Sequence, residues 1–198
     1  MRALEAARLR LGRHHGLTRV LLADLADTYQ LQDRHGEAAR LIAELVAEPR
    51  MNQETGRLAG GDLKGLRLLG RNLVREGKYA AAEPPLRKYL TLFEKTTAGR
   101  PCDFVWPRQH GFRTQVVLGA SLLGQKKYAE AEPMLCEGYR RMKRQPEAEG
   151  AVPTPLDRRY LNEALGWLVQ LYEEWGKPDE AARWRKELHQ AQAEGTRQ

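Results

Sequence analysis

The sequence is poor in the residues that build disulfide frameworks, membrane spans and β-strands. Its 198 residues include two cysteines, Cys102 and Cys136, too few for a disulfide framework, so a reducing compartment is expected. The clearest apolar stretch, Val116 to Gly124, is far shorter than the ~20 residues of a membrane helix. Val, Ile and Thr are sparse, whereas Leu, Ala, Glu, Arg and Gln are frequent, which favours helices. Since the first residues also lack the apolar segment of a secretory signal, we expect an all-α cytoplasmic protein.

The balance of charge is basic. Hydrophobic residues make up 41% and charged residues 30% of the chain, which is typical of a folded domain and not of a disordered one. The formal net charge is +7. Such an excess favours acidic partners, whether nucleic acid, an anionic membrane surface or an acidic peptide, and does not choose among them.

The strongest signal is an internal repeat. Three segments read alike, at 77–84, 126–133 and 176–182, and a weaker copy lies at 33–39. Each copy carries an alanine at the same position, and these alanines are 44, 49 and 50 residues apart. They are Ala38, Ala82, Ala131 and Ala181. A period of this length is typical of a helical solenoid, in which stacked repeats bury a continuous core.

The repeats predict pairs of antiparallel helices. Upstream of each alanine, apolar residues recur at positions i, i+3, i+4 and i+7, which is one face of an amphipathic helix. Gly70 and Gly119 in the first helices, with the alanines in the second, are small enough for close packing. We expect four helix pairs, at about 17–48, 57–96, 108–144 and 157–192, after a remnant helix and linker at 1–16 and before a frayed tail at 193–198.

The repeat motif resembles a known family. The turn Gly77-Lys78-Tyr79-Ala80-Ala81-Ala82 resembles the tetratricopeptide repeat (TPR), and the long spacing, with the linker Leu11-Gly12-Arg13-His14-His15, looks like the kinesin-light-chain type. The segment from Trp106 to Leu188 resembles the C-terminal TPR block of planctomycete-type bacterial Ser/Thr protein kinases. The resemblance implies a right-handed TPR-like superhelix with a peptide-binding concave groove. Because residues 1–11 resemble a second helix without its first, the chain is expected to be the C-terminal part of a longer array.

Motifs of catalysis and metal binding are missing from the sequence. It has no Gly-rich phosphate loop, no His-Arg-Asp loop and no Asp-Phe-Gly triplet, as a kinase would need, and no dinucleotide fingerprint. The histidines and cysteines form no ligand pair of the usual spacing. They are His14, His15, His35, Cys102, His110, Cys136 and His189. We expect no catalytic residue, no metal and no cofactor.

A basic stripe is the first candidate binding site. It consists of Lys64, Arg67, Arg71 and Arg75. Their spacings of 3, 4 and 4 residues place them on one face of a helix, which the TPR register turns toward the groove. Guanidinium groups in a concave site suit carboxylate or phosphate recognition. The alternative is internal pairing, because Asp24 and Asp27 occupy matching positions one repeat earlier.

Trp167 and Gln170 form the second candidate site, because both fall at groove-facing positions. An exposed groove tryptophan would anchor a peptide, whereas the alternative is a role in the core or in capping. Tyr172 and Trp184 are expected in the core. The leading hypothesis is a non-catalytic scaffold that binds a protein or peptide segment, preferably acidic. The alternatives are a basic helical-repeat RNA binder and the non-catalytic tail of a kinase, and the oligomeric state stays open.

Overall fold

The computed structural model describes residues 2–47, 60–97, 105–148 and 154–195, and within these ranges every regular element is an α-helix. The all-α prediction is therefore confirmed. The helices are α1 (Arg2–Leu11), α2 (Gly16–Leu31), α3 (His35–Ala47), α4 (Gly60–Arg75), α5 (Tyr79–Thr97), α6 (Val105–Gly124), α7 (Tyr128–Ala148), α8 (Pro155–Glu174) and α9 (Pro178–Gly195). Among the described helices, none combines the length and apolarity needed to cross a bilayer.

Four three-residue turns connect consecutive helices into hairpins. Each turn follows α2, α4, α6 or α8 and has one residue with positive φ, namely Asp33 at 58°, Gly77 at 71°, Lys126 at 60° and Gly176 at 74°. The next amide always donates to a carbonyl five residues back, from Arg34 to Tyr29, Lys78 to Leu73, Lys127 to Leu122 and Lys177 to Tyr172. This is the left-handed C-terminal cap that ends a helix and reverses the chain. The repeated sequence segments coincide with these four turns.

Small residues at the predicted positions allow the helices of a hairpin to pack closely. The anchor alanines Ala38, Ala82 and Ala131 are completely buried, and Ala181 is 2% exposed. A Cβ atom on Gly70 would lie 2.4 Å from Leu86 Cδ2, and one on Gly119 would lie 2.6 Å from Leu135 Cγ. The leucine of one helix therefore fills the space that the glycine of the other leaves open.

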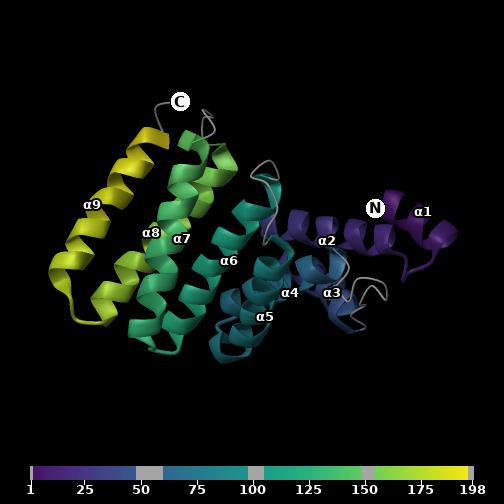
Figure 1. Ribbon diagram of the computed structural model, residues 1–198, viewed down its shortest axis with the longest axis horizontal. Coiled ribbons are helices and arrows are strands. Elements are labelled where there is room, and N and C mark those ends of the chain that lie inside the picture. The colour runs from purple at the N-terminus through teal and green to yellow at the C-terminus, as the bar shows by residue number, and fades with distance from the viewer. Residues whose placement is uncertain (1, 48–59, 98–104, 149–153, 196–198) are drawn as a thin grey trace. The chain divides into compact units, whose positions relative to one another are not determined.

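The chain forms two compact units, residues 1–96 and 97–198. In the first unit, coloured purple to teal in Figure 1, α2 packs against α1, α3 and α4. Its buried core includes Leu22, Ala26, Ile42 and Leu68. In the second unit, green to yellow, α7 packs against α6 and α8, and α8 packs against α9. Its core includes fully buried leucines of α6, α7 and α8, namely Leu118, Leu122, Leu135, Leu165, Leu168 and Leu171.

The described part of the chain has a helix near each of its ends. The segment expected as a remnant helix forms α1, which buries Leu4 and Ala7 and leaves Leu9 87% exposed. Helix α9 continues to Gly195, beyond the expected end at residue 192. The linker residues 48–59 and 98–104, including Cys102, lie outside the described ranges.

Candidate binding surfaces

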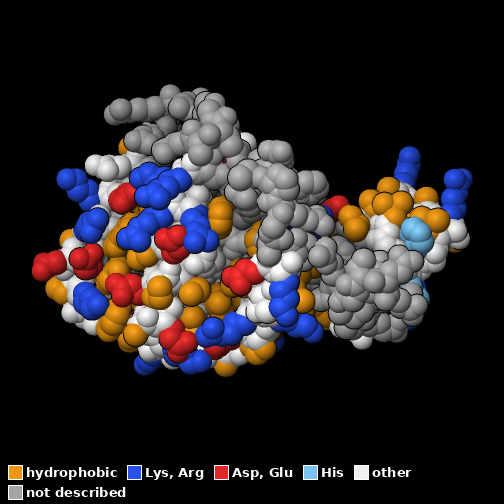
Figure 2. Space-filling model, viewed as in Figure 1, with side chains coloured by type: hydrophobic (Ala, Val, Ile, Leu, Met, Phe, Trp, Pro, Cys, Tyr) orange, Lys and Arg blue, Asp and Glu red, His pale blue; other side chains and the backbone are white. Residues whose placement is uncertain are grey.

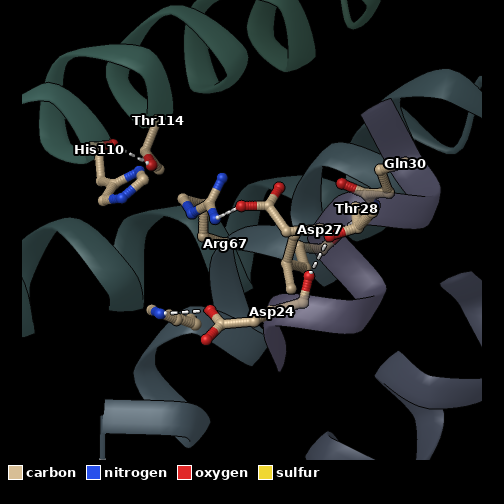
Figure 3. Close-up of polar contacts among 9 residues, drawn as sticks. Asp24, Asp27, Thr28, Gln30, Arg67, His110 and Thr114 are labelled. Carbon is tan, nitrogen blue, oxygen red and sulfur yellow. Dashed lines mark hydrogen bonds and ion pairs between the residues drawn. The ribbon is translucent and has the colours of Figure 1, made fainter. Parts of the chain in front are cut away.

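The basic stripe of α4 pairs with aspartates of the preceding hairpin. Lys64 Nζ lies 2.6 Å from Asp24 Oδ1, and an Arg67 guanidinium nitrogen lies 2.8 Å from Asp27 Oδ2. Figure 3 shows Arg67 of α4 pointing toward Asp27 of α2. Arg75 follows at the end of α4, with a guanidinium nitrogen 3.1 Å from Asp33 Oδ1. Because the partners follow in the same order along both segments, α2 and α4 run in the same direction, about one repeat apart.

Burial also limits what the basic stripe can offer to a ligand. Arg67 is 4% exposed and Arg71 is 3% exposed, so neither guanidinium lies on an open surface. The imidazole of His35 also contacts Arg75, because its Nε2 lies 2.8 Å from a guanidinium nitrogen of Arg75. Internal pairing, which the sequence offered as the alternative, is thus what the geometry gives for Lys64, Arg67 and Arg75.

A third ion pair between α2 and α4 is buried on both sides, and sequence reasoning missed it. Arg19 Nε donates to Asp62 Oδ1 at 2.8 Å, and a terminal nitrogen of Arg19 donates to the Leu45 carbonyl at 2.5 Å. The side chains of Arg19 and Asp62 are 5% and 1% exposed. Gly61 lets α4 approach α2 here, because a Cβ on it would lie 2.6 Å from the Arg19 carbonyl carbon. The available signal was on α2 alone, where the charged Arg19 directly precedes the apolar residues Val20, Leu21 and Leu22.

The side of α8 that is not buried in the core brings the second pair of candidate residues together. The α8 stripe, as we name it, consists of Glu163, Gly166, Trp167, Gln170 and Glu174. Its spacing of 3, 1, 3 and 4 residues keeps all members on one face of the helix, whereas the opposite face is buried in the core. Trp167 and Gln170 are both half-buried, and Gln170 Nε2 donates to Glu174 Oε1 at 2.7 Å.

The other described tryptophans of the second unit have structural contacts. Trp184 is 6% exposed and meets Tyr139 edge-on at 5.7 Å, and Tyr172 is 4% exposed, so the core prediction for Tyr172 and Trp184 is confirmed. Trp175 stacks on Tyr172 and Tyr128, with centroid distances of 6.4 and 6.0 Å. The side chain of Trp106 lies outside the described residues.

The buried thiol of Cys136 lies beside a hydrogen-bonded tyrosine. Cys136 Sγ is 3.8 Å from the Tyr172 hydroxyl, which donates to Glu132 Oε1 at 2.6 Å. Burial raises the pKa of the Cys136 thiol, and burial together with the hydrogen bond to Glu132 raises the pKa of Tyr172. Both groups are therefore protonated at neutral pH, whereas a catalytic thiol needs a lowered pKa. Within the described ranges, no group of three or more His, Cys, Asp or Glu residues has the arrangement to hold a metal ion.

No protein-family model matches the chain, and none of the curated proteins gives a significant match.

Proposed function

We propose that the chain is a non-catalytic protein-interaction scaffold, a TPR-like array of about four helix pairs in a right-handed superhelix. The repeated turn geometry and the small residues at the helix contacts support this class of repeat. In such arrays the first helix of each pair packs one side into the core and presents the other to a ligand. The resemblance of the region from residue 106 to 188 to a kinase-associated block supports a role as the non-catalytic part of a signalling protein.

The observation that carries the proposal is the α8 stripe. An indole and a side-chain amide are held on a helix whose opposite side is buried, which preorganises them for contact with a partner. Tryptophan is the residue type most enriched at the energetic centres of protein interfaces. The basic stripe supports partner binding less, because aspartates already pair with three of its four cations.

An alternative function is nucleic-acid binding, for which α7 gives a specific observation. Arg140 and Arg144 are exposed and four residues apart, so they lie on one face of α7. Figure 2 shows cationic side chains on this side of the second unit, interspersed with acidic ones. Arg141 and Lys143 are each 2.7 to 2.8 Å from a glutamate, which reduces the positive charge available to phosphates. The interaction scaffold is therefore the better-supported function.

The test is affinity capture from a lysate at low and high salt, followed by titration of each captured protein in purified form. We expect a discrete protein whose affinity falls at least about tenfold in Trp167→Ala, as for a central interface residue. Leu17→Ala is the matched control, because Leu17 is 52% exposed on α2 in the first unit. Recovery of nucleic acid alone, at low salt and from every variant, would establish the alternative instead.

A further inference from the structure

We propose that the α8 stripe binds a cationic peptide segment, with an arginine or lysine side chain of the peptide over the ring of Trp167. This inference rests on the proposed scaffold function and names the chemistry of its partner. It differs from the acidic partner expected from the sequence, because it uses another helix and the opposite charge.

The ring of Trp167 is free to receive a cation. The two other described tryptophans of this unit each lie under one, with Lys177 Nζ 3.3 Å from the Trp175 centroid and the Arg183 guanidinium carbon 5.8 Å from that of Trp184. In the described part of the chain, Trp167 has no stacking, cation–π or hydrogen-bond partner. The negative face of an indole attracts guanidinium and ammonium groups.

The stripe also carries acidic groups at both ends. Glu163 and Glu174 are eleven residues apart, which is about 16 Å along a helix and about five residues of extended peptide. Among the described residues, the Glu174 carboxylate accepts a hydrogen bond from the neutral Gln170 amide and pairs with no cation. Glu174 is also the last residue of α8, where the helix dipole adds negative potential.

Space beside the indole permits a peptide backbone to approach. A Cβ atom on Gly166 would meet no atom within 4 Å, so the surface next to Trp167 is open. In contrast, three of the four cations of the basic stripe of α4 pair with aspartates of the first unit. The α8 stripe therefore combines an open surface, an indole without a cation and a carboxylate that pairs with none, which a cationic segment complements and an acidic one does not.

The experiment uses two synthetic twelve-residue peptides, one alternating Arg and Ser and one alternating Glu and Ser, each labelled with fluorescein. Their binding to the full chain is measured by fluorescence anisotropy. Because the protein has a net charge of +7, non-specific attraction favours the glutamate peptide. We expect the arginine peptide to bind more tightly than the glutamate peptide. Trp167→Ala should lower the affinity for the arginine peptide several-fold, because the cation–π contact is lost.

Two variants of Gly166 distinguish the effect of an added charge on peptide affinity from the effect of an added side chain. Gly166→Arg adds a cation to the stripe. We expect it to lower the affinity for the arginine peptide at least about tenfold, because like charges at an interface repel. Gly166→Gln is the control of similar size, and it should change the affinity less than about threefold. Glu174→Gln should also weaken binding, whereas Glu5→Gln, the same charge change on an exposed residue of α1, should not. Thermal denaturation checks that each variant is folded.

The outcomes also separate this inference from the scaffold proposal. Equal binding of the arginine peptide to wild type and Gly166→Arg, no binding at all, or preference for the glutamate peptide would overturn the inference. If a partner captured from lysate binds Gly166→Arg as well as wild type, the scaffold stands and the cationic site is wrong. If no protein partner is captured but the arginine peptide binds in the expected way, the site stands and the scaffold proposal is wrong.

Discussion

At the scale of single residues, the same amino acid has opposite effects at two helical positions. Gly119 packs so closely that an added Cβ would lie 2.6 Å from Leu135 Cγ and 3.1 Å from the Leu135 backbone nitrogen. We expect Gly119→Ala to lower the free energy of unfolding of the second unit by about 1–3 kcal/mol through overpacking. Gly166→Ala, in open space, should raise it by up to about 1 kcal/mol through helix propensity. Urea denaturation followed by tryptophan fluorescence measures both, and equal signs would contradict the proposed contact.

The anchor alanines make a related prediction. Ala131 is completely buried, whereas Ala129, two residues earlier in α7, is exposed. We expect Ala131→Leu to destabilise the second unit by about 1–3 kcal/mol, because the larger side chain does not fit the contact between the helices. Ala129→Leu introduces the same side chain at the surface and should change stability by no more than about 0.5 kcal/mol. If the melting temperatures of the two variants are equal, the helix register described here is wrong.

At the scale of helices, the buried ion pair between α2 and α4 gives a prediction for the first unit. Removing one partner of such a pair leaves a charge without compensation in a dry site. We expect Asp62→Leu to lower the free energy of unfolding by about 3–5 kcal/mol. The double variant Arg19→Met with Asp62→Leu should lose less than Asp62→Leu alone, because no charge remains buried. Circular dichroism at 222 nm during urea unfolding measures both, and a larger loss in the double variant would contradict this account.

The start of α8 predicts a dependence on pH. The Thr154 hydroxyl and amide both hydrogen-bond to Asp157 Oδ2, at 2.6 and 2.9 Å, and an Arg113 nitrogen lies 2.6 Å from Oδ1. Burial raises the pKa of Asp157, but these hydrogen bonds and the charge of Arg113 outweigh it and lower the pKa below the usual 3.8. A lowered pKa gives stability that is complete above the unfolded value and is lost as the pH falls through the folded one.

We therefore expect Asp157→Asn to destabilise the second unit by about 1–2 kcal/mol at pH 7, which is typical of a lost helix cap. The difference from wild type should begin to shrink as the pH falls below about 3.8, because the carboxylate of the unfolded wild type is protonated there, and it should disappear once the pH is below the lowered pKa of the folded state. Urea unfolding of both proteins at pH 7 and pH 3 measures this difference in the free energy of unfolding. Asp179→Asn, an exposed carboxylate in the first turn of α9, is the control. A difference that does not depend on pH would contradict the assigned role of the carboxylate.

The helices were predictable from the sequence because their signals are local. The four turns repeat in sequence, and each alanine or glycine at a helix contact marks its hairpin. Packing against neighbouring helices was harder to predict. In α4 the helical spacing of Leu66, Leu69 and Leu73 indicates a packed side, whereas the structure buries Leu68 completely and leaves these three half-buried. The reason is that α4 is contacted by α2, by α3 and by Leu86 of α5, so its buried residues do not lie on one narrow face.

The polar residues between helices were predictable only in part. The pairing of Asp24 and Asp27 with α4 followed from their matching positions in adjacent repeats. Arg19 and Asp62 are 43 residues apart, a separation close to the 40 residues between Asp24 and Lys64. Spacing therefore does not distinguish a buried pair from an exposed one, and the three-dimensional contact is needed to show that this pair is buried. The α8 stripe was predictable in part. Helical spacing placed Trp167 and Gln170 on one face, but the open space at Gly166 depends on what surrounds that face.

At the scale of the whole molecule, the two compact units define how the chain should unfold. Each has its own buried core, and the stability of a repeat array is approximately the sum of local terms. All four tryptophans, at positions 106, 167, 175 and 184, belong to the second unit. Tryptophan fluorescence therefore reports on residues 97–198 alone, whereas circular dichroism at 222 nm reports on the helices of both units.

The last prediction uses this difference between the two signals. We expect Asp62→Leu to shift part of the circular dichroism transition in urea to lower concentration and to leave the fluorescence transition in place. Gly119→Ala should shift the fluorescence transition and only the corresponding part of the circular dichroism. Residues 1–96 and 97–198, expressed separately, should each unfold cooperatively near the midpoint of the corresponding unit in the full chain. If Asp62→Leu shifts both signals equally, the chain unfolds as one cooperative body, and damage at α4 would then weaken binding at α8.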